Sequence, residues 1–208
     1  MDWDVVTLAG WIGAFAFALS GFLMGARKEL DVVGIFILCM LTANGGGALR
    51  DVLVGRVPLV LQSSTPFLIA LTVMAIGWLF RLDRRTALER NTLFVLCDAV
   101  GLVAFSVTGA MVGIESGLPM FGVMVLAFLT ATGGGILRDM IVREVPVVLN
   151  SDFYGSVALL VALALFGLYK AGLQSEITTA VVLAVALLLR LFAYKKDWQV
   201  PRLRLPKE

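Results

Sequence analysis

The strongest constraint on the fold of this chain is a nine-residue segment that occurs twice. Residues 45–53 read GGGALRDVL and residues 133–141 read GGGILRDMI, so the offset is 133 − 45 = 88. Both copies lie inside long apolar stretches. Each glycine costs an exposed helix roughly 1 kcal/mol relative to alanine, and a charge at membrane depth costs at least about 2.5 kcal/mol on insertion scales. A chain that carries both costs twice, in register, needs these segments for function or for close packing.

The composition indicates an all-α integral membrane protein. The chain is 60% hydrophobic and 15% charged, whereas soluble domains average about 25% charged residues. The apolar runs have the length of helices and lack the alternation of a membrane barrel. Histidine is absent, which excludes imidazole metal sites and His-dependent catalytic triads. The basic residues cluster beside apolar spans, so the net charge of +2 does not indicate a nucleic-acid partner.

Seven membrane spans are predicted. They cover residues 5–26, 32–57, 66–80, 92–113, 119–145, 154–169 and 177–194. The third and sixth are short for a hydrocarbon core of about 30 Å, so their ends should reach into flanking polar residues. Pro58 and Pro146 are expected to close the second and fifth spans, because proline lacks the N–H that a helix interior needs. Cys39 and Cys97 fall inside spans and are expected to be small buried hydrophobes.

The repeat extends well beyond the glycines. Residues 8–62 align without gaps with residues 96–150. Each unit holds three spans, an odd number, so the second unit must be inverted relative to the first. We therefore expect one membrane domain over 1–208: repeat one at 5–81, repeat two at 92–170, an extra helix at 177–194 and a short basic cytoplasmic tail at 195–208. Inverted repeats place their site near the midplane at the repeat interface.

Lysine and arginine predict the orientation. With the N-terminus outside, the inner loops and the C-terminal tail collect most of the basic residues, and the outer side keeps little more than Arg56 and Lys170. By the positive-inside rule this asymmetry predicts an outer N-terminus and a cytoplasmic C-terminus.

The glycine runs lie near the middle of the second and fifth spans, where they permit a kink or a break. A broken helix offers carbonyls for cations and N–H groups for anions, so the local geometry does not choose the sign of a permeant ion. Close helix packing is the alternative use of such glycines. Arg50 and Asp51 should lie in the outer half and Arg138 and Asp139 in the inner half. Neighbours on a helix diverge by about 100°, so each arginine and its aspartate should face different partners. Two charged tiers around a glycine waist resemble a pore or occluded site more than an enzyme centre.

Five further polar residues are candidates for supporting roles. Asn44 and Thr132 precede the two glycine runs, and Ser20 and Thr108 lie on the first and fourth spans, where a hydroxyl often bonds its own backbone. Asp98 has no acidic counterpart in repeat one. Its depth, roughly 9 Å from the inner end of its span, is close to that of Arg138 at roughly 10 Å. Our hypothesis is therefore that Asp98 holds Arg138 near the inner mouth; the alternative is that Asp98 faces the inner headgroups or water.

These features resemble the prokaryotic trimeric intracellular cation (TRIC) channels, a family also labelled a glycine transporter domain. The resemblance covers the whole chain and implies a homotrimer in the prokaryotic inner membrane, with one pore per protomer, lined by kinked second and fifth helices and carrying K⁺ and other monovalent cations. It implies no cofactor, no enzymatic step and no metal other than the permeant ion; the expected partners are further copies of the chain, membrane lipid, and K⁺ or Na⁺. The residues that it implies for the pathway are Gly45, Gly46, Gly47, Arg50, Asp51, Gly133, Gly134, Gly135, Arg138 and Asp139.

Two other functions fit the pattern. A secondary carrier for glycine or a similar small zwitterion would use a half-helix N-terminus for the carboxylate and Asp51 or Asp139 for the amine. A purely structural membrane subunit would explain the packing glycines but would leave four buried charges without a role.

Overall fold

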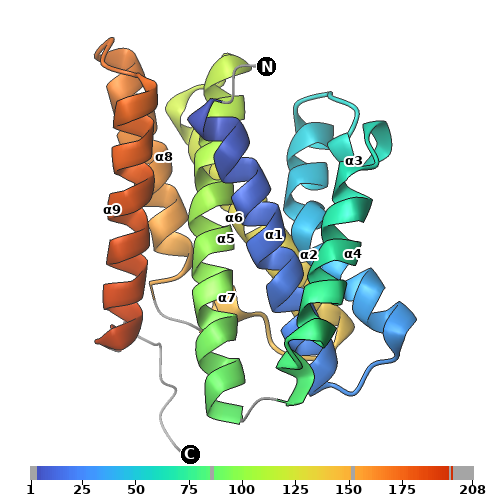
Figure 1. Cartoon of the computed structure of the whole chain (residues 1–208). Helices are drawn as coiled ribbons and strands as arrows, with labels where there is room; N and C mark the ends of the chain where they lie inside the picture. The colour runs from blue at the N-terminus through green and yellow to red at the C-terminus, as the bar shows by residue number, and fades with distance from the viewer. Residues whose placement is uncertain (1–3, 85–86, 151–152, 197, 199–208) are drawn as a thin grey trace, which may run out of the picture.

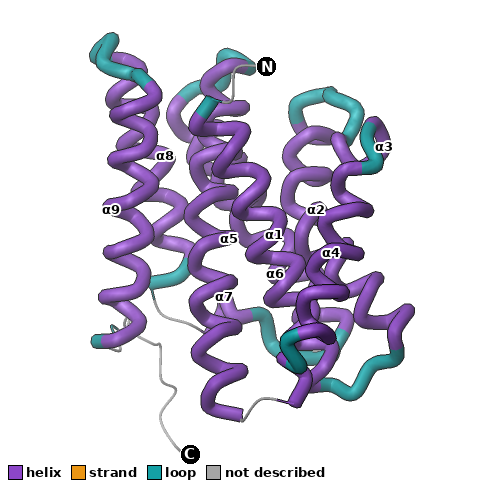
Figure 2. Tube along the Cα trace, in the orientation of Figure 1, coloured by secondary structure: helices purple, strands orange, loops and turns teal. Residues whose placement is uncertain are grey.

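The computed structural model describes residues 4–84, 87–150, 153–196 and 198, and in this part of the chain all regular structure is helical, without a strand (Figure 2). The predicted basic tail beyond Trp198 lies outside the described residues. The helices are α1 (Val5–Arg27), α2 (Val32–Leu53), α3 (Leu59–Gln62), α4 (Thr65–Leu79), the 3-10 turn η1 (Leu82–Arg84), α5 (Ala87–Glu115), α6 (Met120–Ile141), α7 (Val147–Asn150), α8 (Gly155–Lys170) and α9 (Glu176–Lys195).

Seven of these helices correspond to the predicted spans. Over the described residues, α1, α2, α5, α6 and α9 are long and apolar enough to cross a membrane, and α4 and α8 are shorter apolar helices. The chain is therefore an integral membrane protein of the predicted all-α class. The two short helices are the third and sixth spans, as expected from their sequence.

The ends of α2 and α6 differ from the prediction. The helices stop at Leu53 and Ile141, before Pro58 and Pro146 are reached. Gly55 (φ 72°) and Arg143 (φ 57°) adopt left-handed backbone conformations just after them. Such residues end helices by turning the last N–H groups back onto helix carbonyls. The prolines instead precede the short helices α3 and α7.

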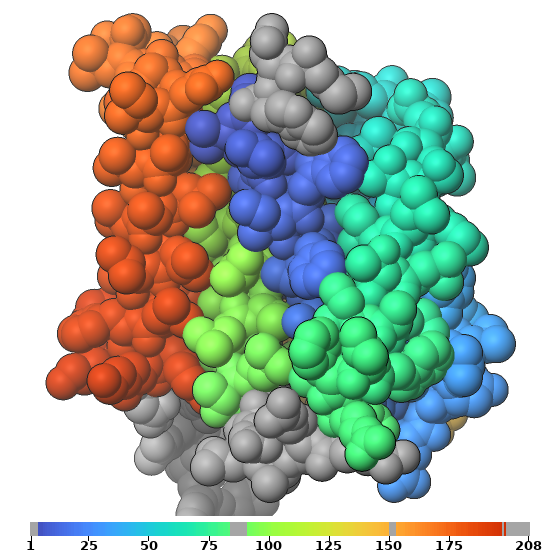
Figure 3. All heavy atoms as spheres, viewed as in Figure 1, coloured from blue at the N-terminus to red at the C-terminus, as the bar shows by residue number. Residues whose placement is uncertain are grey.

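The helices form two inverted three-helix units around a shared centre. In Figure 1, α1 runs from top to bottom and its counterpart α5 from bottom to top. At the centre, α1 and α6 each pack against both α2 and α5. On the outside, α4 covers α1 and α2, α8 covers α5 and α6, and α9 packs mainly on α5 and α8. Figure 3 shows α1 between α4 on one side and α5 with α9 on the other. Following the predicted orientation, we name the end where α1 begins the outer end and the end where α9 finishes the inner end.

Small residues bring the helices of each unit together. A Cβ on Gly21 would meet the Leu38 carbonyl oxygen and Thr42 Oγ1 at 2.9 Å. On Gly109, it would meet Thr130 Oγ1 at 2.7 Å. These glycines allow close packing of α1 on α2 and of α5 on α6, since a methyl group would force each helix pair apart.

Candidate functional site

The glycine runs form the crossing of α2 and α6. A Cβ on Gly46 would clash with the Thr130 carbonyl, and a Cβ on Gly134 would clash with the Thr42 carbonyl. Thr42 and Thr130 are repeat counterparts, as are Gly46 and Gly134, so the contact is reciprocal, as a pseudo-two-fold axis requires. Both helices are continuous through the glycines. The break that the sequence allowed is therefore absent from α2 and α6. The glycines instead permit the two backbones to approach closely.

Only the third glycine of each run faces a polar site. The nearest atom to a Cβ on Gly47 would be Arg50 Nη2 at 4.0 Å. For Gly135 the nearest atoms would be Arg138 Nη2 at 3.7 Å and the Tyr154 hydroxyl oxygen at 3.8 Å. The predicted waist of six glycines is thus divided: four of them, Gly45, Gly46, Gly133 and Gly134, face the opposing helix.

A cavity of about 410 Å³ lies on the outer side of the crossing. We call it the outer cavity. Residues from α1 to α5 line it: Val6, Thr7, Gly10, Trp11, Ala14, Ala43, Asn44, Gly47, Ala48, Arg50, Asp51, Leu59, Val60, Ser63, Thr65, Pro66, Ile69, Phe105, Thr108 and Val112. Most of these side chains are apolar, and the polar ones include the candidates Asn44 and Thr108. With a volume of about 410 Å³, the outer cavity is large enough for a small hydrated ion or solute.

Arg50 and Asp51 pair with each other, contrary to expectation. Arg50 Nε and Nη2 lie 2.8 and 2.7 Å from Asp51 Oδ1. The long arginine side chain folds back along the helix to reach its neighbour, which the 100° divergence of the Cα–Cβ bonds does not prevent. The second carboxylate oxygen, Oδ2, accepts a hydrogen bond from the Leu59 N–H at 3.2 Å. Asp51 therefore neutralises the arginine and also fixes the start of α3.

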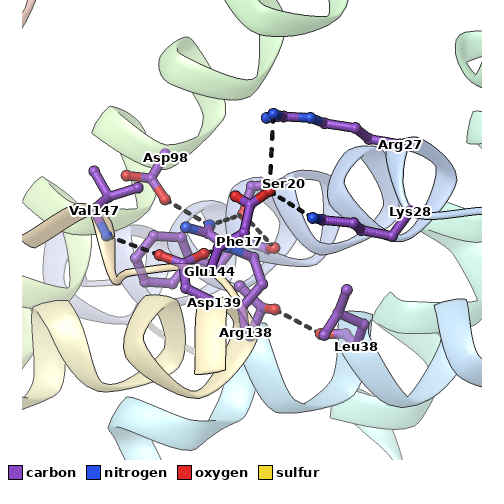
Figure 4. Close-up of polar contacts among 11 residues, drawn as sticks. Phe17, Ser20, Arg27, Lys28, Leu38, Asp98, Arg138, Asp139, Glu144 and Val147 are labelled. Atoms are coloured by element: carbon purple, nitrogen blue, oxygen red, sulfur yellow. Dashed lines mark hydrogen bonds and ion pairs between the residues drawn. The ribbon is translucent and has the colours of Figure 1, made fainter. Parts of the chain in front are cut away.

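On the inner side, Asp139 makes the same two kinds of contact as Asp51. This carboxylate accepts from Arg138 Nε at 2.8 Å and from the Val147 N–H, which begins α7, at 2.9 Å. Figure 4 shows these contacts together with those of Asp98 and Ser20.

Arg138 is fully buried on the inner side of the crossing. We call Arg138 and the residues that contact it the inner cluster. Arg138 Nη1 donates to Asp98 Oδ1 at 2.7 Å and to Ser20 Oγ at 2.9 Å. The predicted Asp98–Arg138 contact is confirmed. The guanidinium carbon also lies 4.5 Å from the centroid of the Phe94 ring. Among the described residues, Nη2 has no hydrogen-bond partner.

The counterpart of the outer cavity on the inner side of the crossing is a narrow crevice. Eight residues surround this crevice, which is too small to hold a water molecule; they are Thr132, Gly135, Ile136, Arg138, Asp139, Val147, Val148 and Tyr154. Subtracting the repeat offset of 88 gives eight residues that all line the outer cavity; they are Asn44, Gly47, Ala48, Arg50, Asp51, Leu59, Val60 and Pro66. We call the inner set the inner half-site. One sequence pattern has therefore produced an open half-site and a closed one.

The supporting hydroxyls and amide bond mainly to their own helices. Asn44 Nδ2 donates to the Met40 carbonyl at 2.9 Å and Thr132 Oγ1 to the Phe128 carbonyl at 2.8 Å. Thr108 Oγ1 donates to a carbonyl of its own helix at 3.2 Å. Ser20 does the same at 2.9 Å but also accepts from Arg138. In the described part of the chain no group of three or more acidic or cysteine residues could hold a metal ion.

Sequence reasoning missed three residues in or beside the inner cluster. Phe94 and Tyr154 pack on or beside the guanidinium of Arg138, and Arg190 lies with its guanidinium carbon 4.8 Å from the centroid of the Tyr154 ring. A signal existed for two of them. Tyr154 replaces Pro66 of repeat one, and Arg190 is a charge inside the last apolar span.

At the inner surface the loops are joined by ion pairs. Glu144 Oε1 lies 2.7 Å from Lys28 Nζ and 3.8 Å from Arg27 Nη2. The hydrogen bond from Lys28 holds the pKa of the Glu144 carboxyl below its usual value. This contact connects the α1–α2 loop with the segment that follows α6, beside the inner half-site (Figure 4).

The fold and the two half-sites define a class of protein: a polytopic helical membrane protein with polar sites on both sides of a central helix crossing. The sequence profile described as Glycine transporter matches residues 7–82 and again residues 95–170, one match per three-helix unit. The chain belongs to this family.

Relatives and solved structures agree with this assignment. The chain is 34% identical to the UPF0126 membrane protein YvgT of Bacillus subtilis, over 97% of this chain and 96% of that protein. It is 30% identical to the UPF0126 inner membrane protein YadS of Escherichia coli, over 91% and 92%. A prokaryotic TRIC channel crystallised in 0.5 M KCl superposes with a TM-score of 0.86 at 28% identity, over 94% of this chain and 98% of that one. The TRIC trimeric intracellular cation channel orthologue from Rhodobacter sphaeroides gives 0.85 at 33% identity, over 92% and 98%.

Proposed function

We propose that this chain is a monovalent cation channel, permeable to potassium, that works without an enzymatic step. The observation that carries the proposal is the pair of half-sites related by the repeat, one on each side of the α2–α6 crossing. A path across the membrane through one protomer would run from the outer cavity past Gly47 and Gly135 to the inner half-site. The similarity to TRIC cation channels over nearly the whole chain supports the same function.

The chemistry of the outer cavity suits a cation. Monovalent cations in proteins are held by oxygen atoms, and the cavity offers them from Asp51, Asn44 and Thr108. The cation Arg50 would repel a permeant cation, but its pairing with Asp51 at 2.7 Å removes most of that charge. An ion in the cavity would therefore meet polar oxygen atoms in a setting with little net charge.

The assembly in this proposal is a homotrimer with one pathway per protomer, lying in the inner membrane of a prokaryote and surrounded by lipid. Support comes from the description of the Rhodobacter sphaeroides orthologue as trimeric and of the Escherichia coli relative as an inner membrane protein. The positive-inside rule supports an outer N-terminus and a cytoplasmic C-terminus.

A carrier for glycine or a similar zwitterion is the second candidate. An open half-site facing one side and a closed counterpart facing the other are what alternating access requires. The paired Arg50 and Asp51 could bind a carboxylate and an amine, and the family description names a glycine transporter.

Recording from purified protein in planar bilayers with symmetrical KCl separates the candidates. Unitary currents are expected for the channel. Saturable glycine uptake by proteoliposomes, without unitary currents, would identify a carrier and refute the channel. If the folded protein shows neither unitary currents nor glycine uptake, a purely structural role remains.

A charge placed in the cavity links the current to this site. Asn44→Lys should lower the potassium current several-fold, because it adds a positive charge to the cavity wall. Gln62→Lys is the matched control, since Gln62 is exposed on α3, near the same end of the molecule, and does not line the cavity. Equal currents in the two variants would contradict a path through the outer cavity.

A further inference from the structure

Around the two half-sites, several residues of repeat two differ in kind from their counterparts in repeat one. Where repeat two has Asp98, repeat one has Gly10, and where repeat two has Tyr154, repeat one has Pro66. Arg190 has no counterpart at all, because α9 lies outside the repeat. The two repeats therefore differ in the residues that surround Arg138 and its counterpart Arg50.

Tyr154 occupies the space that is open in repeat one. It stands at the N-terminus of α8 and is 2% exposed. Its hydroxyl lies beside Gly135, with Asp98 and Arg138 as its charged neighbours. The counterpart Pro66 is smaller, has no hydroxyl and borders a cavity of about 410 Å³. The tyrosine ring, together with Ile136 where repeat one has Ala48, thus fills the inner half-site.

Arg190 packs on the ring of Tyr154. Its guanidinium carbon lies 4.8 Å from the centroid of Tyr154, within the range of a cation–π contact. Arg190 is buried, although most of α9 faces away from the protein. A charged residue inside the membrane indicates a functional role by default. Here it connects α9 with the inner half-site through the ring of Tyr154.

We propose that Tyr154 is the residue that closes the inner end of the pathway and that Arg190 positions its ring, so that the seventh helix controls opening. When the Tyr154 ring leaves the inner half-site, Thr132, Gly135 and Arg138 become the lining of an inner cavity that matches the outer one. The identity of the permeant ion or solute rests on the proposed function, but the closure of the inner half-site by Tyr154 does not.

Cysteine accessibility tests the closure without any transport assay. In a background with Cys39 and Cys97 replaced by alanine, Thr132→Cys reports on the inner half-site and its counterpart Asn44→Cys on the outer cavity. A membrane-impermeant methanethiosulfonate reagent is applied from each side in turn. Asn44→Cys should react from the outer side and Thr132→Cys should be protected on both sides.

Removing the ring should expose the inner half-site. Adding Tyr154→Ala should raise the labelling rate of Thr132→Cys from the inner side at least about tenfold, since closed states of this kind open to a minor state populated at roughly 0.1–10%. Arg190→Gln, which keeps the ring but removes the cation, should raise the rate by a smaller factor. Tyr154→Phe should stay closed, because the ring remains. The matched control is Tyr169→Ala, which removes an exposed tyrosine from the same helix.

Two results would overturn the proposal: unchanged labelling in both Tyr154→Ala and Arg190→Gln, or the same increase in Tyr169→Ala. Arg190→Gln keeps the test decisive should Tyr154→Ala fail to fold. Potassium flux is measured in the same proteoliposomes. Increased labelling with increased flux supports both the closure and the channel, whereas increased labelling without flux in any variant refutes the channel and leaves the closure standing.

Discussion

The buried contact between Asp98 and Arg138 allows a quantitative prediction. Arg138 is one cation between two carboxylates, at 2.7 Å from Asp98 and 2.8 Å from Asp139. Asp98→Asn removes one charge but keeps an oxygen that can accept from Nη1, and it leaves Arg138 paired with Asp139. The expected loss in the free energy of unfolding is about 1–3 kcal/mol.

Arg138→Gln should cost more than Asp98→Asn. It leaves two carboxylates in the membrane interior without their cation, and breaking a buried pair typically costs about 3–5 kcal/mol. For a chain of this size each kcal/mol lowers Tm by about 2–4 °C. The double variant should lose less than the sum of the single losses, by about 1–3 kcal/mol, because the two residues interact directly.

Thermal unfolding in detergent measures all three variants. Arg50→Gln is the matched control, because Arg50 is the repeat counterpart of Arg138 but has a side chain that is 15% exposed and only Asp51 as its ion-pair partner among the described residues. It should lose clearly less than Arg138→Gln. Additive losses in the double variant, or an equal loss in the control, would refute an energetic coupling at the inner half-site.

Three further predictions concern packing, pH and orientation. Gly46→Ala should lower stability by about 1–3 kcal/mol because its methyl group meets backbone, whereas Gly47→Ala should be neutral or slightly stabilising; thermal unfolding of the two variants compares them, and equal effects would contradict a packing role. The ion pairs of Glu144 should contribute stability above the ordinary pKa of a glutamate and lose it as the pH falls through its lowered folded pKa. Glu144→Gln should remove this pH dependence, worth at most about 1 kcal/mol for so exposed a pair; an unchanged pH profile of Tm would exclude it. Impermeant thiol reagents should label Ser175→Cys in intact cells and Glu29→Cys only after permeabilisation, and the reverse pattern would invert the topology.

Much of the fold could be predicted from the sequence. Hydrophobic runs of helix length can satisfy their backbone groups in a membrane only as helices, so the seven spans follow from composition and length. An odd number of spans per repeat requires inversion. The shared depth of Asp98 and Arg138 follows from the rise per residue of a helix, which is why their contact could be predicted across 40 positions of sequence.

The predicted closing role of Pro58 and Pro146 was wrong for a local reason. The helices end earlier because Gly55 and Arg143 turn the chain into the left-handed region, and only one of these residues is a glycine. The pairing of each arginine with the aspartate next to it was missed because side-chain length outweighs the angle between neighbouring Cα–Cβ bonds.

The sequence by itself determined the helices, their inverted order, and the depth at which each charge lies, because these depend on residue type and spacing along one chain. Which glycines face the opposing helix and which face a polar site was decided by the α2–α6 crossing. The contrast between an open outer cavity and a closed inner half-site was also decided by tertiary structure. Two nearly identical segments differ there because Tyr154 and Ile136 fill the inner half-site. Asp98 binds Arg138 and Arg190 packs on the Tyr154 ring, and among the described residues these contacts between helices have no counterpart around Arg50.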